Sequence, residues 1–324
     1  MRCWPKCNKD IVYMLAITYV YGMNRNHLAL FYAVAQAGGI SRGAELAHIS
    51  QPAVSKQIAE LEGALGVRLL ERLPRGCRLT EAGALLADYA RPWRSVENEA
   101  ERAIAEYRGL QRGRLAIGAS LTIGGYLLPG AIAEFHRRYP ALDLQVETAN
   151  TQHIQDSLLA GTLELGLTEG PMEDDELESV VFHQDELVVI APAGHPLLKK
   201  KSVAAREVCR EPFILREEGS GTRAVVERAL RRKGITVKPM LSLASPEAIK
   251  NTVAAGLGLA IVSRLIVDLE VRTGLLGIIP LKDLTIRRPL HRQRVRGRRQ
   301  SPAAEKFLEV LTRRLAQPAR VSRD

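Results

Sequence analysis

The hydrophobic pattern of this chain changes at about residue 114. Before that point, apolar residues recur every three or four positions, which is the spacing of amphipathic helices. After it, short apolar runs alternate with helical stretches, which is typical of α/β domains. A length of 324 residues, 46% of them hydrophobic, is sufficient for two buried cores. The sequence therefore predicts a helical amino-terminal module followed by an α/β carboxyl-terminal module.

The stretch ISQPAVSKQIAELEGALG, residues 49–66, predicts one well-defined helix. A proline breaks a helix interior, but with Ser50 as the N-cap, Pro52 falls in the first turn, where backbone N–H groups have no intrahelical acceptor. The apolar face of this helix consists of Val54, Ile58, Leu61 and Leu65. Small and hydrogen-bonding side chains are left on the opposite face.

A shorter helix precedes this one. It is predicted to be capped by Ser41 and to end at Leu46, with a turn over residues 47–49. A short capped helix, a tight turn and a helix with an open polar face predict a helix-turn-helix, whose second helix enters the major groove of DNA. The candidate contacts to bases and phosphates are Gln51, Ser55 and Lys56. An ordinary surface helix is the alternative.

Residues 69–80 add a predicted β-hairpin. Two short strands, residues 69–72 and 77–80, flank the turn sequence LPRG. This pattern predicts a wing with Arg72 and Arg75 near its tip, where arginines contact phosphates or a narrow minor groove. A solvated basic hairpin is the alternative.

Thr80 then caps a long helix, predicted from Glu81 to about Leu110. Its apolar residues are spaced three and four apart, with one irregularity at Pro92, where we expect a bend. Such a seam predicts pairing with a second helix, and a dimer would reach two DNA half-sites about 34 Å apart. Packing of the seam against its own domain is the alternative.

The carboxyl-terminal module contains eight predicted strands, at residues 115–119, 142–148, 164–168, 186–192, 213–216, 240–243, 257–262 and 276–280. Helices are predicted at residues 125–139, 151–160, 222–233, 246–255, 264–273 and 302–314. This alternation predicts parallel sheets covered on both faces and divided between two α/β lobes. Lobes of this class bind ligands beyond the carboxyl ends of their strands.

At three places, small polar residues follow a strand and begin a helix. These are Ser120-Leu121-Thr122, Gly219-Ser220-Gly221-Thr222-Arg223 and Ser245-Pro246-Glu247. Converging helix starts with hydroxyl groups and Arg223 would hold a small anion, because their N–H groups are free and carry partial positive charge. Each stretch is also an ordinary capping sequence, so the predicted site depends on their joint position.

Other features limit the class of protein. No P-loop lysine, G-x-S-x-G or H-E-x-x-H motif is present, so catalysis is not predicted. The unpaired spacing of the cysteines favours a reducing compartment, the cytoplasm, and argues against a metal site; they are Cys3, Cys7, Cys77 and Cys209. The apolar run of residues 11–22 is too short to span a membrane. We expect Met23 to be the native start and residues 1–22 to be a non-native extension.

The charge is concentrated at the carboxyl end. The net charge is +10, and residues 287–323 contain twelve Lys or Arg against two acidic residues, which suggests an anionic partner. Leu290 and three arginines (292, 294 and 296) alternate with His291, Gln293 and Val295, and an amphipathic helix follows. We therefore predict a basic edge strand tied to a terminal helix. A nucleic-acid-binding tail is the alternative.

These motifs resemble the LysR-type transcriptional regulators. The resemblance extends from about Met23 to Phe307 and is most specific in SRGAELAHISQPAVSKQIAELEGALGVRLLER and LTEAG, residues 41–72 and 79–83. It continues in GASLTIGGYLLPGAIAEFHRRYP, residues 118–140. The stretches LREEGSGTR and AAGLGLAIVS, residues 215–223 and 254–263, are similar to the branch that controls carbon fixation and sulfur assimilation.

The resemblance implies a winged helix-turn-helix at residues 23–80, a dimerising linker helix at 81–111 and a two-lobed effector domain at 112–318, like a periplasmic binding protein. The lobes are expected at about 112–182 with 287–318, and at about 183–286, followed by a tail at 319–324. With the predicted caps, the candidate DNA-binding residues are Ser41, Ser50, Gln51, Pro52, Ser55, Lys56, Arg72 and Arg75. The implied effector-binding residues are Ser120, Thr122, Thr168, Ser220, Thr222 and Ser245. Lys56 stands where arginine is common, and lysine lacks the bidentate fork.

The resulting hypothesis is a cytoplasmic regulator that binds double-stranded promoter DNA as a homodimer or homotetramer. Its co-inducer would be a small inorganic or organic anion, with no cofactor, and RNA polymerase is a further candidate partner. Two alternatives are a solute-binding receptor and an enzyme on the same lobes, such as a dehydratase or transferase. A receptor would need a secretory signal, and none is predicted. An enzyme would need an acid, base or nucleophile constellation, and the sequence does not predict one.

Overall fold

The computed structural model describes residues 24–73, 76–107, 113–170 and 174–316. The predicted extension at residues 1–22, the tail at 319–324 and the wing-tip Arg75 lie outside the described residues. The chain divides into two compact units, residues 1–101 and 102–324. Among the described residues, no helix is both long and apolar enough to cross a membrane.

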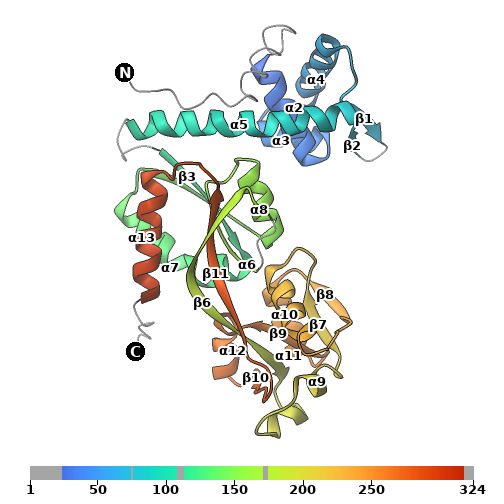
Figure 1. Cartoon of the computed structure of the whole chain (residues 1–324), viewed down its shortest axis with the longest axis vertical. Helices are drawn as coiled ribbons and strands as arrows, with labels where there is room; N and C mark the ends of the chain where they lie inside the picture. The colour runs from blue at the N-terminus through green and yellow to red at the C-terminus, as the bar shows by residue number, and fades with distance from the viewer. Residues whose placement is uncertain (1–23, 74–75, 108–112, 171–173, 317–324) are drawn as a thin grey trace. The chain divides into compact units, whose positions relative to one another are not determined.

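Three helices form the core of the first unit (Figure 1): α2 (Arg25–Ala37), α3 (Ile40–Ala47) and α4 (Gln51–Leu65). The predicted apolar face of α4 packs inward, because Val54, Ile58 and Leu61 are buried. Helix α3 approaches α2 so closely that a side-chain carbon on Gly43 would lie 2.8 Å from the Val34 Cα. Glycine is therefore needed where the first two helices touch.

The two predicted serine caps have different outcomes. Ser50 is the N-cap of α4, and Pro52 lies in its first turn, as predicted. The prediction for Ser41 is wrong, because the N-cap of α3 is Gly39, two residues earlier, and the helix begins at Ile40. The reason is Gly38, whose left-handed backbone (φ 63°) ends α2 and lets Gly39 start α3 at once. Ser41 therefore lies inside the first turn of α3.

The predicted wing is confirmed as an antiparallel pair, β1 (Leu70–Leu73) with β2 (Gly76–Leu79). Thr80 follows β2, and its Oγ1 accepts a hydrogen bond from the Gly83 backbone N–H at 3.0 Å. This cap begins α5 (Glu81–Tyr107). Helix α5 continues through Pro92, so the predicted irregularity does not end the helix.

In the second unit, nine strands of the described residues form one mixed sheet in the order β4-β3-β5-β11-β6-β9-β7-β8, with β10 paired to β6. The strands are β3 (Gly113–Ser120), β4 (Leu142–Ala149), β5 (Leu165–Glu169), β6 (Leu177–Pro192), β7 (Phe213–Arg216), β8 (Leu241–Leu243), β9 (Leu259–Ser263), β10 (Leu276–Ile279) and β11 (Ile286–Val295). Strand β3 is parallel to β4 and β5, and β7 is parallel to β8 and β9. Strands β6, β10 and β11 are antiparallel to their neighbours, so the prediction of parallel sheets is correct only within each lobe.

The helices of this unit are α6 (Leu121–Tyr126), α7 (Leu128–Arg138), α8 (Thr151–Leu159), α9 (Ala205–Val208), α10 (Gly221–Arg231), α11 (Pro246–Ala254), α12 (Asp268–Arg272) and α13 (Pro302–Ala316). Two 3₁₀ turns, η1 (Pro196–Lys199) and η2 (Arg264–Ile266), complete it. Lobe 1 consists of β3–β5, α6–α8 and α13, and its core contains Phe135 and Phe307 in edge-to-face contact at 5.4 Å. Lobe 2 consists of β7–β10 and α9–α12, with separate cores on the two faces of its sheet.

Strands β6 and β11 pair with each other and run through both lobes (Figure 1). The prediction of a basic edge strand is therefore wrong, because β11 lies between β5 and β6 in the middle of the sheet. Its charged residues are accommodated there by partners on β6: Arg288 lies against Asp185, and Arg294 against Glu178. The predicted terminal helix that follows is confirmed as α13.

Candidate functional sites

The first turn of α4 is open to solvent. Its exposed residues are Ser50, Gln51, Pro52 and Lys56, and Ser55 is partly exposed. The Ser50 side chain makes no capping hydrogen bond within the described residues, so its hydroxyl can be offered outward. Because Val54 and Ile58 are buried behind this turn, the helix presents polar groups without losing its anchorage. A helix that enters a major groove requires this arrangement.

Ser41 and Gln51 come together on this surface. The Ser41 Oγ donates a hydrogen bond to the Gln51 Oε1 at 3.2 Å, although Ser41 belongs to α3 and Gln51 begins α4. Both residues line a shallow, open depression, whose other residues are Ala44, Glu45, His48, Ile49 and Ser50. The hydrogen bond fixes the direction of the Gln51 amide, which would otherwise rotate freely at an exposed position.

Lys56 is only weakly held by its own chain. Its Nζ lies 3.8 Å from the Glu60 Oε1 one helical turn away, and the Lys56 side chain is 78% exposed. An exposed pair of this kind contributes little free energy. Lys56 can therefore exchange Glu60 for a phosphate or a base edge at small cost.

The wing is fixed to α4 by Glu62. The Glu62 Oε1 accepts hydrogen bonds from the backbone N–H groups of Leu69 and Leu70, at 2.7 and 3.1 Å. These bonds set where β1 starts relative to α4. The register pairs Arg72 with Cys77, next to the turn of the hairpin. Arg72 is thus placed by its backbone near the wing tip, whereas Arg75 lies outside the described residues.

In the second unit, five of the six candidate effector residues are buried where the two lobes meet: Ser120, Thr122, Thr168, Ser220 and Thr222. Ser120 and Ser220 are the N-caps of α6 and α10, and their hydroxyl oxygens accept from the Ile123 and Arg223 N–H groups. Ser245 is also an N-cap, of α11, but it is exposed and outside this buried group. Arg223 is directed to its own helix, where its Nε donates to the Glu227 Oε1 at 2.8 Å.

The lobes approach each other closely beside Ser220. The Gln152 N–H of lobe 1 donates to the Gly219 carbonyl of lobe 2 at 3.2 Å. A side-chain carbon on Gly221 would lie 1.7 Å from the carbonyl oxygen of Glu169, so only glycine fits at that position. These contacts bring the start of α10 against the end of β5.

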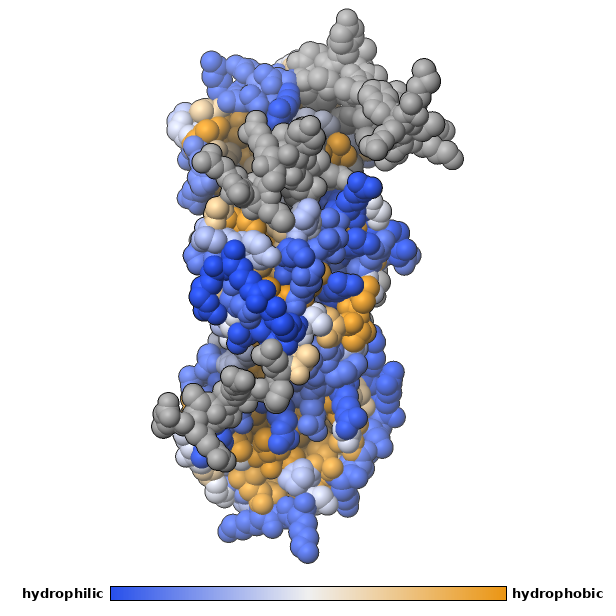
Figure 2. Space-filling model, turned by 90° about the vertical axis from the view of Figure 1, so that its left-hand side faces the viewer, coloured by the Kyte–Doolittle hydropathy of each residue, from blue (hydrophilic) through white to orange (hydrophobic). Residues whose placement is uncertain are grey.

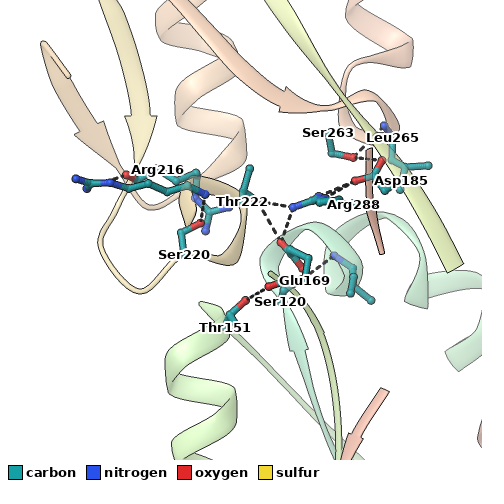
Figure 3. Close-up of polar contacts among 12 residues, drawn as sticks. Ser120, Thr151, Glu169, Asp185, Arg216, Ser220, Thr222, Ser263, Leu265 and Arg288 are labelled. Carbon is teal, nitrogen blue, oxygen red and sulfur yellow. Dashed lines mark hydrogen bonds and ion pairs between the residues drawn. The ribbon is translucent and has the colours of Figure 1, made fainter. Parts of the chain in front are cut away.

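Three buried charged residues, absent from the sequence predictions, occupy the centre of this junction (Figure 3): Glu169, Asp185 and Arg288. The Arg288 Nη1 donates to the Thr222 Oγ1 at 2.7 Å and lies 3.2 Å from the Glu169 Oε1. The Arg288 Nε donates to the Asp185 Oδ2 at 2.7 Å, and the Ser263 Oγ donates to the Asp185 Oδ1 at 3.0 Å. Arg288 therefore joins a strand of lobe 1, a helix of lobe 2 and the strand β6 that connects them.

A second polar contact joins the lobes through α6 and α11. The Tyr126 hydroxyl donates to Glu247, and the Lys250 Nζ lies 2.9 Å from Glu247 and 2.6 Å from Glu270. Burial alone would lower the pKa of Lys250, but the hydrogen bonds to Glu270 and Glu247 outweigh it and raise the pKa. Lys250 is therefore a cation that is already neutralised. The described residues contain no cluster of three or more His, Cys, Asp or Glu side chains placed to bind a metal.

Comparisons with known proteins divide the chain in a similar way. The family described as LysR substrate binding domain matches residues 108–316, and the family described as bacterial regulatory helix-turn-helix protein, lysR family, matches residues 25–84. The RuBisCO operon transcriptional regulator of Allochromatium vinosum is 35% identical over 284 residues, which cover 88% of this chain and 94% of that protein. The HTH-type transcriptional regulator CysL of Bacillus subtilis is 32% identical, over 81% of this chain and 88% of its own. The structure of the Synechocystis CcmR regulatory domain in complex with 2-PG is 29% identical with a TM-score of 0.58, and covers 62% of this chain and 97% of that chain.

Proposed function

Because this chain belongs to the LysR family of DNA-binding transcriptional regulators, we propose that the first turn of α4 reads promoter DNA and that the interlobe residues bind a small anionic effector. The observation that carries the first part is the open turn of α4, where Gln51 is held by Ser41 and Lys56 is almost free. The relatives compared above are named as regulators, which disfavours the receptor and enzyme alternatives.

In this proposal, Gln51 contacts a base edge, since glutamine pairs well with adenine in the major groove. Ser50, Ser55 and Lys56 contact bases or phosphates nearby, Pro52 packs against the groove, and Arg72 and Arg75 contact phosphates beside the wing. Phosphate contacts carry most of the affinity and make it salt-dependent. Promoter DNA as the partner also places the protein in the cytoplasm.

Footprinting on the region upstream of its own gene would locate a site, and mobility shifts at several salt concentrations would then test the residues. Lys56→Ala and Arg75→Ala should each weaken binding and reduce the salt dependence by about one counterion. The matched control is Lys201→Ala, an exposed lysine of lobe 2, which should leave affinity unchanged. Equal affinities for all four proteins would refute the proposed reading surface.

The effector part is supported by the concentration of buried hydroxyl groups at the interlobe junction. CcmR, a regulatory domain of the same family, is described in complex with 2-PG, which supports a small ligand for this class of domain. A ligand can shift a regulator only by binding one arrangement of its lobes better than another. Thermal-shift assays with sulfate, sulfite, phosphate and phosphorylated sugars should show binding that Thr222→Val weakens.

The assembly proposed is a homodimer through α5, extended to a homotetramer, with RNA polymerase as a further partner. Three residues of the predicted seam of α5, Leu85, Tyr89 and Val96, are exposed. Ala90, on another side of the helix, is buried, so these three exposed apolar residues are available to a second chain. On the face drawn in Figure 2, hydrophobic residues also gather over lobe 2, which supports a further contact between subunits.

A further inference from the structure

One oxygen of Glu169 is buried without a hydrogen-bond partner among the described residues. The whole residue is 1% exposed, and its Oε1 accepts from the Thr222 Oγ1 at 3.2 Å and faces Arg288. Its Oε2 has no such partner. Figure 3 shows this side chain directed from the end of β5 toward Thr222 and Arg288, at the place where the lobes meet. A buried carboxylate oxygen that lacks a donor is costly, so its retention calls for an explanation.

The charge balance around Glu169 makes this oxygen more unusual. Glu169 and Asp185 together carry two negative charges, and the only described cation in contact with both is Arg288. The other basic side chains of the junction are already paired: Arg216 with Glu217, Arg223 with Glu227, and Lys250 with Glu247 and Glu270. An anion that binds among these residues is therefore met by hydroxyl and N–H donors, and by one excess carboxylate.

We infer that Glu169 selects the effector by accepting a hydrogen bond from it through Oε2. The inference rests on the anionic effector site proposed above and specifies which anions it takes. An anion with an O–H or N–H group, such as hydrogen phosphate, a phosphate ester with a neighbouring hydroxyl, or a hydroxy acid, gives Oε2 its missing donor. A fully deprotonated anion such as sulfate places a like charge against an unpaired buried oxygen, which is unfavourable.

A ligand that binds the Glu169 Oε2 would also affect how the two lobes are held together. Glu169 is on lobe 1, and its Oε1 is bonded to Thr222 on lobe 2 and faces Arg288. A ligand that binds Oε2 therefore contacts a side chain that already links the lobes, so it stabilises their closed arrangement more than an open one. Recognition of the donor and closure of the lobes are then the same event.

Sulfate and hydrogen phosphate are a matched pair of probes, since they have the same shape and charge and differ by one proton. Calorimetric titration of the full-length protein at mildly alkaline pH should show phosphate binding at least about tenfold more tightly than sulfate. This comparison needs no substitution, so it does not depend on a variant that folds.

Glu169→Gln then tests the residue itself. Glutamine removes the excess charge and can donate through its Nε2, so sulfate binding should strengthen and the preference should fall to about threefold or less. The matched control is Glu247→Gln, which removes a carboxylate from the other interlobe contact but has a partner, Tyr126, in the described structure. It should leave the preference unchanged.

The outcomes separate the two proposals. If neither anion binds the native protein, the anionic effector site itself fails, and this inference fails with it. If both bind equally, if Glu169→Gln keeps the preference, or if Glu247→Gln removes it as well, the role of Glu169 is overturned while the anion site stands.

Discussion

The proposed reading surface on α4 and the charged group between the lobes use polar residues in opposite ways. On α4 the polar side chains lie at the surface and Lys56 is held only by an exposed ion pair, while buried apolar residues behind them carry the stability. Between the lobes, Glu169, Asp185 and Arg288 are buried and hold one another. A surface that binds DNA must keep its donors free, whereas a buried charge must be paired to exist at all. Substitutions should therefore separate binding from stability on α4 and combine them between the lobes.

The largest effect that distinguishes the two regions is expected from Arg288→Met. It leaves two buried carboxylates without their cation, and breaking a buried ion pair in this way costs about 3–5 kcal/mol of unfolding free energy. Urea denaturation of the full-length protein, followed by circular dichroism, would measure the loss. On the reading surface, Lys56→Ala should change the unfolding free energy by less than about 0.5 kcal/mol.

Arg287→Met is the matched control, because it is the same change one residue away, at an exposed position of the same strand. Its unfolding free energy should remain within about 0.5 kcal/mol of the native value. Similar losses for both arginines would show that the strand, and not the buried charged group, is responsible.

The same contrast explains what could be predicted from the sequence. Helix α4 was predictable because a capping serine, a first-turn proline and a three-to-four spacing are all signals within one short stretch. The shift of the α3 cap from Ser41 to Gly39 was not, because it depends on the left-handed backbone that Gly38 adopts. Five of the effector candidates could be proposed from their positions at helix starts, but one of them, Ser245, proved exposed. Thr168 lies in β5 and followed only from the family resemblance.

The pairing of the interlobe charges could not be predicted because they meet only through the register of distant strands. Arg288 and Asp185 are 103 residues apart and are brought together by the pairing of β11 with β6. The arginine-rich composition around Arg288 indicated an exposed edge strand, since buried arginine is rare. For Glu169 a local signal existed: a carboxylate that directly follows the buried strand residues LGLT.

The seam of α5 differs from both regions, because its residues are apolar and exposed. We expect them to stabilise the proposed dimer and not the fold of the single chain. Leu85→Glu places a charge on the seam. The dissociation constant of the proposed dimer should therefore rise at least about tenfold, which corresponds to about 1.4 kcal/mol of association free energy. Sedimentation velocity would measure the association. Ala84→Glu, also exposed but outside the seam, should leave it intact, and equal weakening by both would exclude the seam as the interface.

A smaller effect is expected from the hydrogen bond between Ser41 and Gln51. Ser41→Ala frees the Gln51 amide to rotate, so promoter affinity should fall by about 0.5–1.5 kcal/mol, as for a single hydrogen bond. In a double-mutant cycle, Ser41→Ala should cost less promoter affinity in the Gln51→Ala background than in the native protein. Additive losses in mobility-shift assays would mean that Ser41 contacts DNA by itself and does not position Gln51.

The smallest effect concerns pH and a half-buried residue on β11. Burial lowers the pKa of His291 below its ordinary value of 6.5, and its Nδ1 lies 2.8 Å from the Ser179 Oγ. Below that pH the unfolded chain takes up a proton that the folded protein resists, so the unfolding free energy should fall as pH decreases below 6.5. The contribution of His291 to this slope cannot exceed about 1.4 kcal/mol per pH unit.

His291→Asn should remove this part of the slope in urea denaturation measured on either side of that pH. Ser179→Ala is its control, because it removes the neighbouring hydroxyl while the imidazole still titrates. It should lower the unfolding free energy without removing the dependence on pH. An unchanged slope in His291→Asn would assign the acid sensitivity to other groups. The interlobe strand β11 would then contribute no more to the pH dependence of the unfolding free energy than the exposed surface of α4 does.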